Sequence, residues 1–207
     1  MQKIMFDDRY CLTDGTIKQR KKETRRNELT DKEQAVIQEL CASGERRPYI
    51  IRGCIVIRDG YGKEVFRKPT RYSIGEIVAV AQNYNDAGIN SYYIVSYRED
   101  GTPVPAIQSP GWTNKMFVRA DLMPHQIRIT GIRIERLQEI SDEDCMKEGI
   151  RYIPEIGKFY FEDVLREAGF YFDNPREAFA ALIDKVSGRG TWDRNPYVVV
   201  YQFELMK

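Results

Sequence analysis

The segment 18–26 is the part of the chain where cationic side chains are densest. Lysine or arginine occupies six of these nine positions, namely Lys18, Arg20, Lys21, Lys22, Arg25 and Arg26. Cations that face phosphates can dominate nucleic-acid affinity at low salt, so this segment is a candidate contact for RNA. A solvated charged segment without any ligand has the same composition, and that interpretation stays open.

The sequence has few of the residues that common nucleophilic, metal-dependent and cofactor-dependent enzymes need. His125 is the one histidine, so any Ser-His-Asp or Cys-His arrangement would depend on it. The four cysteines are far apart and form no C-x-x-C pair, so we expect reduced thiols and no metal site. The sequence also lacks the glycine patterns of P-loop, dinucleotide-binding and α/β-hydrolase proteins. We therefore expect no cofactor.

The composition is that of an ordinary globular protein. The 207 residues include 32 Lys+Arg and 31 Asp+Glu, and 42% are hydrophobic. This suits one elaborated domain over residues 1–207. The charge is uneven, because residues 1–71 carry 17 Lys+Arg against 11 Asp+Glu. That part of the chain could therefore attract a polyanion.

The N-terminus turns acidic at Asp7 and Asp8 before an apolar signal region can develop. No window approaches the ~18 consecutive apolar residues of a membrane span. We therefore expect a cytoplasmic protein that does not contact a membrane. The sequence leaves its oligomeric state open.

Helix caps and apolar spacing predict three helices. The capping box that starts at Thr30 predicts a helix over about 31–42. Ser141 begins a short helix that ends at Gly149, and Asn174 begins a longer one that ends before Gly188. The expected buried stripe of the longer helix consists of Phe179, Leu182, Ile183 and Val186.

Runs of β-branched and aromatic residues predict the strands. Residues 49–58 and 64–66 are expected to form a hairpin, and Gly131 is expected to lie at a bulge in a half-solvated strand. The other expected strands are Ile77 to Ala81, Ser91 to Tyr97, Lys115 to Arg119, Gln126 to Leu137 and Tyr197 to Leu205. With helices between them and no regular alternation, this order predicts an α+β fold around a small barrel, with residues 86–113 as a long loop insertion.

The basic segment also resembles a known signature. It is similar to the G-x-K-x-x-T-x-R pattern of the ASCH domain family, a branch of the PUA-like fold, with Lys21, Thr24 and Arg26 on the signature positions. Gln19 stands where the signature has glycine. Three further blocks resemble phage and prophage ASCH proteins, and they follow in the same order at 72–80, 127–149 and 175–204.

This resemblance implies a β-barrel with flanking helices and a cleft that binds RNA, a nucleotide or a modified base. Small members of the family are amidohydrolases that deacylate acetylcytidine, with a lysine as base, a threonine as nucleophile and a glutamate as proton donor. Those roles fall on Lys21, Thr24 and Glu148. This chain is about twice as long as those compact hydrolases.

Catalysis by Lys21, Thr24 and Glu148 would require particular pKa shifts and a particular arrangement of these side chains. A lysine activates a threonine hydroxyl only where burial or neighbouring cations lower the lysine pKa. Lys21 and Thr24 share a face if their segment is helical. Glu148 is expected in the last turn of its helix, where the helix dipole would raise the carboxyl pKa.

Several other residues are candidates for ligand contact. Aromatic side chains can stack on bases and arginines can bind phosphates, although each can instead pack or form ordinary ion pairs. The ligand-binding candidates are Arg20, Arg25, Arg26, Trp112, Trp192, Asn195 and Tyr197.

Three functions remain open from the sequence. The preferred one is a module that binds RNA, a nucleotide or a modified base in a barrel cleft. The second is an amidohydrolase that deacylates an acetylcytidine-like nucleoside. The third is a phage-encoded protein-interaction module that has lost its ligand.

Overall fold

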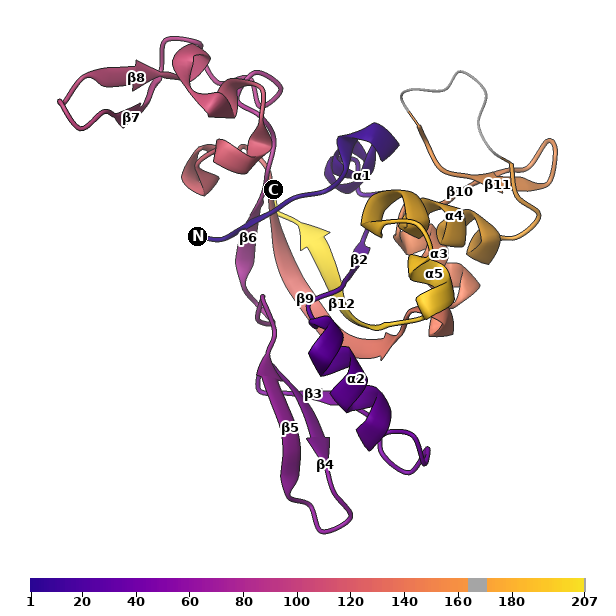
Figure 1. Cartoon of the computed structure of the whole chain (residues 1–207). Coiled ribbons are helices and arrows are strands. Elements are labelled where there is room, and N and C mark those ends of the chain that lie inside the picture. Colours follow the sequence, from indigo (N-terminus) through magenta and orange to yellow (C-terminus); the bar gives the residue numbers. More distant parts are fainter. Residues whose placement is uncertain (164–170, 207) are drawn as a thin grey trace.

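Five strands form the central sheet of this α+β protein. In the computed structural model, which describes residues 1–163 and 171–206, they follow the order β1-β6-β9-β12-β2 (Figure 1). Their bounds are Lys3–Ile4 for β1, Ile77–Val80 for β6, Gln126–Arg136 for β9, Tyr197–Leu205 for β12 and Glu23–Arg26 for β2. β1 runs parallel to β6, and the other neighbours are antiparallel.

The long pair β9 and β12 forms the middle of this sheet and confirms the predicted bulge. Gly131 pairs with Gln202, whereas the next pair joins Ile129 to Phe203, so Thr130 is the extra residue. A Cβ at Gly131 would lie 2.4 Å from Gln202 Oε1. Glycine therefore leaves room for the Gln202 side chain at the bulge.

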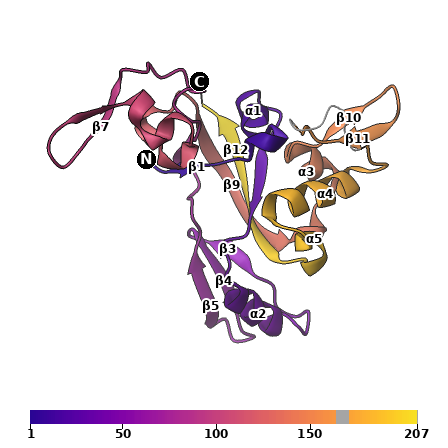
Figure 2. The ribbon, with the colours of Figure 1, turned by 45° about the horizontal axis from the view of Figure 1, so that its top comes forward.

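A second sheet of three strands projects from the body together with a helix (Figures 1 and 2). The elements are α2 at Asp31–Leu40, β3 at Tyr49–Ile51, β4 at Cys54–Arg58 and β5 at Glu64–Pro69. The capping box of α2 is confirmed. The prediction of one continuous strand over 49–58 was wrong, because Arg52 and Gly53 both take positive φ and form a tight turn between β3 and β4.

The segment 86–113 is more ordered than the predicted loop. It contains the hairpin of β7 at Ile94–Tyr97 and β8 at Pro103–Pro105, and 3-10 helices at Ala106–Gln108 and Pro110–Trp112. Buried residues including Tyr84, Val95 and Ala106 give this part a small apolar cluster of its own. Two more 3-10 helices follow, at Lys115–Phe117 and Ala120–Leu122.

The prediction of a strand at 115–119 was wrong. Asn114 caps a 3-10 helix there, because its side chain accepts a hydrogen bond from the Met116 amide. The Lys115 ammonium donates to Asp8 and to the Phe6 carbonyl, which belong to the N-terminal segment. These tertiary contacts outweigh the local preference for a strand.

The remaining helices lie on the other side of the central sheet from the β7–β8 hairpin (Figure 1). They are α1 at Leu12–Ile17, α3 at Asp142–Lys147, α4 at Pro175–Ser187 and α5 at Thr191–Arg194, with 3-10 helices at Asp8–Tyr10 and Leu137–Glu139. A two-stranded sheet joins β10 at Arg151–Ile153 to β11 at Lys158–Tyr160. Phe179, Leu182 and Ile183 of α4 are buried as predicted, whereas Val186 is 38% exposed at the end of the helix.

The predicted barrel is not confirmed, since none of the sheets in the described residues closes. The central sheet has two edges, β1 and β2. They approach each other all the same, because the Arg26 Nη2 group on β2 donates a 2.6 Å hydrogen bond to the carbonyl of Met5, just after β1. A side chain thus links two edges whose backbones do not pair.

Candidate functional site

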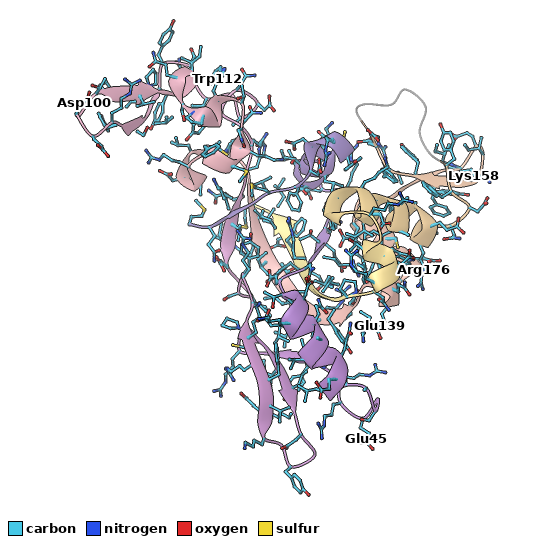
Figure 3. All side chains as sticks on the ribbon, viewed as in Figure 1. Glu45, Asp100, Trp112, Glu139, Lys158 and Arg176 are labelled. Atoms are coloured by element: carbon cyan, nitrogen blue, oxygen red, sulfur yellow. The ribbon has the colours of Figure 1, made fainter. Side chains whose placement is uncertain are left out.

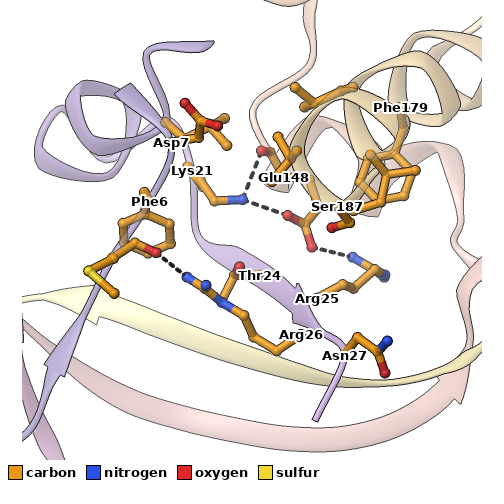
Figure 4. A pocket seen from close by; sticks show the side chains of 15 residues that line it. Phe6, Asp7, Lys21, Thr24, Arg25, Arg26, Asn27, Glu148, Phe179 and Ser187 are labelled. Carbon is orange, nitrogen blue, oxygen red and sulfur yellow. Dashed lines mark hydrogen bonds and ion pairs between the residues drawn. The ribbon is translucent and has the colours of Figure 1, made fainter. Parts of the chain in front are cut away.

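A pocket of about 270 Å³ lies where those two sheet edges meet the helices. Its walls come from the segment 5–7, from β2, from the end of α3 and from α4 (Figure 4). Lys21, Thr24, Arg26 and Glu148 all line it. The structure therefore brings together the residues that the motif resemblance implies for the site.

Lys21 is held at the pocket by the backbone on both sides of it. Its own amide donates to the carbonyl of Gly15 at 2.9 Å, and the next amide, that of Lys22, donates to the carbonyl of Lys147 at 2.8 Å. The segment is extended rather than helical, so the assumption of a helical Lys21 and Thr24 pair was wrong. Both side chains still reach the pocket, because Lys21 precedes the strand on which Thr24 lies.

Gln19 lies at the turn that leads into this segment. Its φ is +58°, in the left-handed region that favours glycine. This is the position at which the ASCH signature has glycine. Gln19 thus adopts the left-handed backbone conformation that glycine favours, although it carries a side chain.

The C-terminal end of α3 places Glu148 at the pocket. The amide of Ile150 donates to the carbonyl of Cys145, and the amide of Gly149 donates to that of Met146, which is a Schellman motif. Gly149 has φ +112°, and a Cβ there would lie 3.3 Å from Leu12 Cδ2. The predicted helix end is confirmed, with Glu148 as its C-cap.

The Lys21 and Glu148 side chains form a buried ion pair. Lys21 Nζ lies 2.5 Å from Glu148 Oε2 and also donates to the Glu148 carbonyl at 2.9 Å (Figure 4). The two residues are 2% and 5% exposed. Such a pair contributes little net stability, but the loss of one partner leaves a buried charge uncompensated.

The pKa values of this pair shift in the same direction. Burial lowers the pKa of Lys21 below its ordinary 10.5, although the Glu148 carboxylate opposes the shift. Burial alone would raise the pKa of Glu148, but the charges of Lys21 and Arg25 outweigh it and hold the pKa below 4.5. The predicted upward shift at Glu148 was therefore wrong. The two directions are compatible, because Arg25 supplies a second cation when Lys21 loses its proton.

Arg25 connects the pocket to a network of charged residues behind it. Its Nη1 lies 3.0 Å from Glu148 Oε1, and its Nη2 lies 2.7 Å from Glu135 Oε1. Asp144 and Glu23 each approach the same guanidinium at 3.5 Å. With a side chain that is 0% exposed, Arg25 acts as a structural link and not as a free cation for a ligand.

Arg133 on β9 completes this network. It bonds to Glu23, Glu135 and Asp144, with the Glu23 Oε2 distance at 2.9 Å. Burial lowers the pKa of Arg133, but the carboxylates of Glu23 and Glu135 outweigh this effect and raise it. Two arginines are therefore shared among four carboxylates, including that of Glu148.

The Thr24 hydroxyl is available for a ligand. Thr24 is 5% exposed and lines the pocket, and no other described residue forms a hydrogen bond with its hydroxyl. Asn27 also lines the pocket, where its Oδ1 accepts a bond from Gln34 and its amide nitrogen donates to no other described residue. The lining thus offers both a hydroxyl and an amide.

Apolar side chains also line the pocket, on two sides of it. The Phe6 ring belongs to the N-terminal segment, and the side chains of Phe179 and Leu182 belong to α4 (Figure 4). Lys21 Nζ lies 5.7 Å from the centroid of the Phe6 ring, and the Arg25 guanidinium lies 5.9 Å from that of Phe179. An amphipathic ligand would therefore find rings and hydrogen-bonding groups close together.

The basic segment does not present a continuous cationic surface. Lys21 and Arg25 are buried in ion pairs, so they are not exposed to RNA. Arg20 pairs with Asp14 at 2.5 Å and lies outside this pocket. A second excess of positive charge lies on the projecting part at residues 43–71, which carries eight Lys+Arg against three Asp+Glu.

The aromatic candidates lie elsewhere in the structure. Trp112 belongs to the part that carries β7 and β8 and packs on its small apolar cluster (Figure 3). Trp192 packs edge-on against Phe179, with ring centroids 6.2 Å apart. Neither lines the pocket. Ligand binding by Trp112 and Trp192 stays a prediction, and it would have to occur outside this pocket.

Asn195 and Tyr197 take part in local structure at the start of β12. The Asn195 side chain accepts a 2.8 Å bond from the Gln138 amide, and its carbonyl accepts from Arg136. The Arg136 guanidinium lies 4.1 Å from the centroid of the Tyr197 ring. Arg136 and Tyr197 border a different hollow, beside Arg46 and Arg47, and Asn195 does not line it.

Sequence reasoning missed Phe6 and the charged network. Phe6 lies in an N-terminal segment without periodicity, so nothing local marks it. Glu135 lies on β9 and Asp144 on α3, far from Arg25 in the sequence. Their contacts with Arg25 become predictable only once the β2-β12-β9 order is known.

Within residues 1–163 and 171–206, no group of three or more His, Cys, Asp or Glu side chains is arranged to hold a metal ion. No helix in that part of the chain is both long enough and apolar enough to cross a membrane. Comparisons with protein-family models, with curated proteins and with solved structures found no match to this chain. The resemblance to the ASCH family thus depends on the quoted residues alone.

Proposed function

We propose that the pocket binds one nucleoside-sized ligand, which is a modified base, a nucleoside or a nucleotide, either free or as a single residue of RNA. The observation that carries this proposal is the combination of a small volume with a lining that includes both polar and aromatic side chains. The volume of about 270 Å³ lies just below the ~300–1,000 Å³ of sites for drug-sized ligands. An RNA strand could place no more than one base in it.

The chemistry of the walls suits a flat heterocycle. A base presents donors and acceptors along its edge and apolar faces above and below its ring. The Thr24 hydroxyl and the Asn27 amide can bond to such an edge, and the rings of Phe6 and Phe179 supply apolar contact.

The motif resemblance supports the same proposal. Lys21, Thr24, Arg26 and Glu148 come from segments more than 120 residues apart and still line one pocket. The two edges of the central sheet approach each other at Arg26 and Met5, as in a sheet that curls towards closure. We therefore propose an ASCH-type module of the PUA-like fold.

Calorimetric titration with cytidine, acetylcytidine, uridine and adenosine tests this function. We expect one of them to bind the wild type and to bind Thr24→Val about 3- to 10-fold more weakly, because a hydrogen bond contributes ~0.5–1.5 kcal/mol. Thr130→Val is the matched control, since Thr130 is exposed on β9 and does not line the pocket. If no nucleoside binds the folded wild type, the result would favour the alternative of a protein-interaction module without a ligand.

A second candidate function is hydrolysis of an acylated cytidine-like nucleoside. The observation in its favour is an unbonded Thr24 hydroxyl in the same pocket as a lysine whose pKa is lowered by burial. A lysine in that state can accept the hydroxyl proton. Because the pKa of Glu148 is lowered as well, this carboxyl starts as a carboxylate and not as an acid.

A consistent sequence of steps starts from neutral Lys21. Thr24 Oγ1 adds to the amide carbonyl carbon of the substrate while Lys21 Nζ accepts the hydroxyl proton. The proton passes to Glu148 Oε2, 2.5 Å away, and from there to the leaving amine nitrogen. The C–N bond breaks, and water then hydrolyses the acyl ester on Thr24.

Incubation with acetylcytidine, followed by chromatography of the products, tests the hydrolase candidate. Turnover is expected in the wild type and in Thr24→Ser, and it should vanish in Thr24→Val while ligand binding persists. The value of kcat/KM should rise with pH through the lowered Lys21 pKa, because the neutral amine is the base. Binding without turnover in the wild type would reject hydrolysis and leave the binding module.

A further inference from the structure

The cations of the pocket differ in how their charges are compensated. Lys21 pairs with Glu148 at 2.5 Å, and Arg25 has four carboxylates within 3.5 Å. Asp7, the other acid in the lining, pairs with Arg9 at 2.7 Å. The acidic groups at the pocket therefore already have cationic partners.

Arg26 is the exception. Among the described residues it makes no ion pair, and the one hydrogen bond of its side chain runs from Nη2 to the Met5 carbonyl at 2.6 Å (Figure 4). Its Nε is buried and has no hydrogen-bond partner. The guanidinium lies 5.3 Å from the centroid of the Phe6 ring, on the lining of the pocket.

The charge of Arg26 is only partly compensated, because the carboxylates of Glu148 and Glu28 attract it without forming an ion pair with it in the described residues. Burial lowers the pKa of Arg26, which is the sign of a charged group that has lost water without gaining enough in exchange. A ring face and one carbonyl compensate a guanidinium only in part. The planar guanidinium carries five N–H donors, and a carboxylate or phosphate group can accept two of them at once.

We propose that Arg26 binds an oxyanion group, a phosphate or a carboxylate, carried by the ligand of this pocket. This inference rests on the proposed function for the nucleoside part of the ligand, but not for the anion. It selects a nucleotide, or a nucleoside with an acidic modification, over an uncharged nucleoside. Neither Lys21 nor Arg25 can take this role, because both are already paired.

The first test compares cytidine 5′-monophosphate with cytidine by calorimetry on the wild-type protein. We expect the nucleotide to bind at least about 10-fold more tightly, because a charge-assisted bidentate contact is among the strongest hydrogen bonds. This comparison needs no variant, so it remains decisive even if an Arg26 variant fails to fold. Equal affinity for the two ligands overturns the inference and leaves the proposed function in place.

The second test measures thermal unfolding in inorganic phosphate, in acetate and in chloride at equal ionic strength. Phosphate or acetate should raise the Tm of the wild type relative to chloride, and the arm with the larger shift identifies the oxyanion. The shift should disappear in Arg26→Gln and persist in Arg128→Gln. Arg128 is the matched control, because its side chain is 44% exposed and lies outside the pocket.

The outcomes of the two tests separate the anion from the nucleoside. An Arg26-dependent Tm shift without any cytidine binding keeps the anion site and rejects the nucleoside proposal. An equal Tm shift in Arg26→Gln and the wild type rejects Arg26 as the anion-binding residue. So does the absence of any shift in the wild type.

Discussion

Lys21 Nζ and Glu148 Oε2 lie 2.5 Å apart in the lining of a small pocket, although 127 positions separate the two residues in the chain. The same carboxylate accepts a 3.0 Å bond from Arg25 Nη1 through its other oxygen. Two cations thus share one carboxylate in a region that water barely reaches. The charge of Glu148 therefore controls both the stability of this part of the fold and the protonation of Lys21.

Glu148→Gln is expected to destabilise the protein by about 3–5 kcal/mol, because it leaves Lys21 buried without its carboxylate. Urea unfolding followed by circular dichroism gives the free energy of unfolding. Glu143→Gln is the control, since Glu143 is 81% exposed and its pairing with Lys147 should contribute no more than ~1 kcal/mol. A similar loss of unfolding free energy in the two variants would show that the buried pair contributes no more to stability than an exposed pair.

The stability contributed by Glu148 should depend on pH with a defined sign. Its pKa in the folded state lies below the ordinary 4.5, so the unfolded chain takes up its proton first as the pH falls. The contribution is complete above about pH 4.5 and is lost on further acidification. Urea unfolding between pH 7 and pH 3 should therefore show the wild type and Glu148→Gln becoming more alike. A constant gap across this range would contradict a lowered pKa.

Helices and strands were predictable where caps or residue patterns within the same segment determine them. The Thr30 capping box, the Asn174 cap and the strands β9 and β12 each depend on neighbouring residues, and each is confirmed. The turn at Arg52 and Gly53 was missed because the β-branched run around it indicates one strand. An arginine at φ +48° is not a residue that a turn pattern selects.

The sequence pointed to residues that share one pocket, but it did not give the electrostatics of that pocket. The motif resemblance selected Lys21, Thr24 and Glu148, which line one pocket. The helix-end argument gave the wrong direction for the Glu148 pKa, because Lys21 and Arg25 approach from β2 and its lead-in. A helix dipole contributes less than two hydrogen-bonded cations, and only the tertiary structure brings those cations there.

Arg25→Gln tests the structural role of the arginine next to the proposed anion-binding residue. It removes a guanidinium that four carboxylates share, so repulsion among them should lower the free energy of unfolding by about 3–5 kcal/mol. Arg67→Gln is the control, because that side chain is 48% exposed and pairs with Glu64 at the surface. Urea unfolding distinguishes them. An Arg25 variant of normal stability would imply that the carboxylates repack or protonate.

Gln19→Gly should stabilise the protein even though it introduces glycine. Gln19 has φ +58°, and the left-handed conformation costs a residue with a Cβ roughly 1–2 kcal/mol. Glycine removes that cost but adds entropy to the unfolded chain, so we expect a net gain of about 0.5–1 kcal/mol in urea unfolding. Gln38→Gly is the control of opposite sign, since Gln38 is exposed within α2 and should lose about 1 kcal/mol. A loss at both positions would mean that the Gln19 side chain makes a contribution greater than its backbone strain.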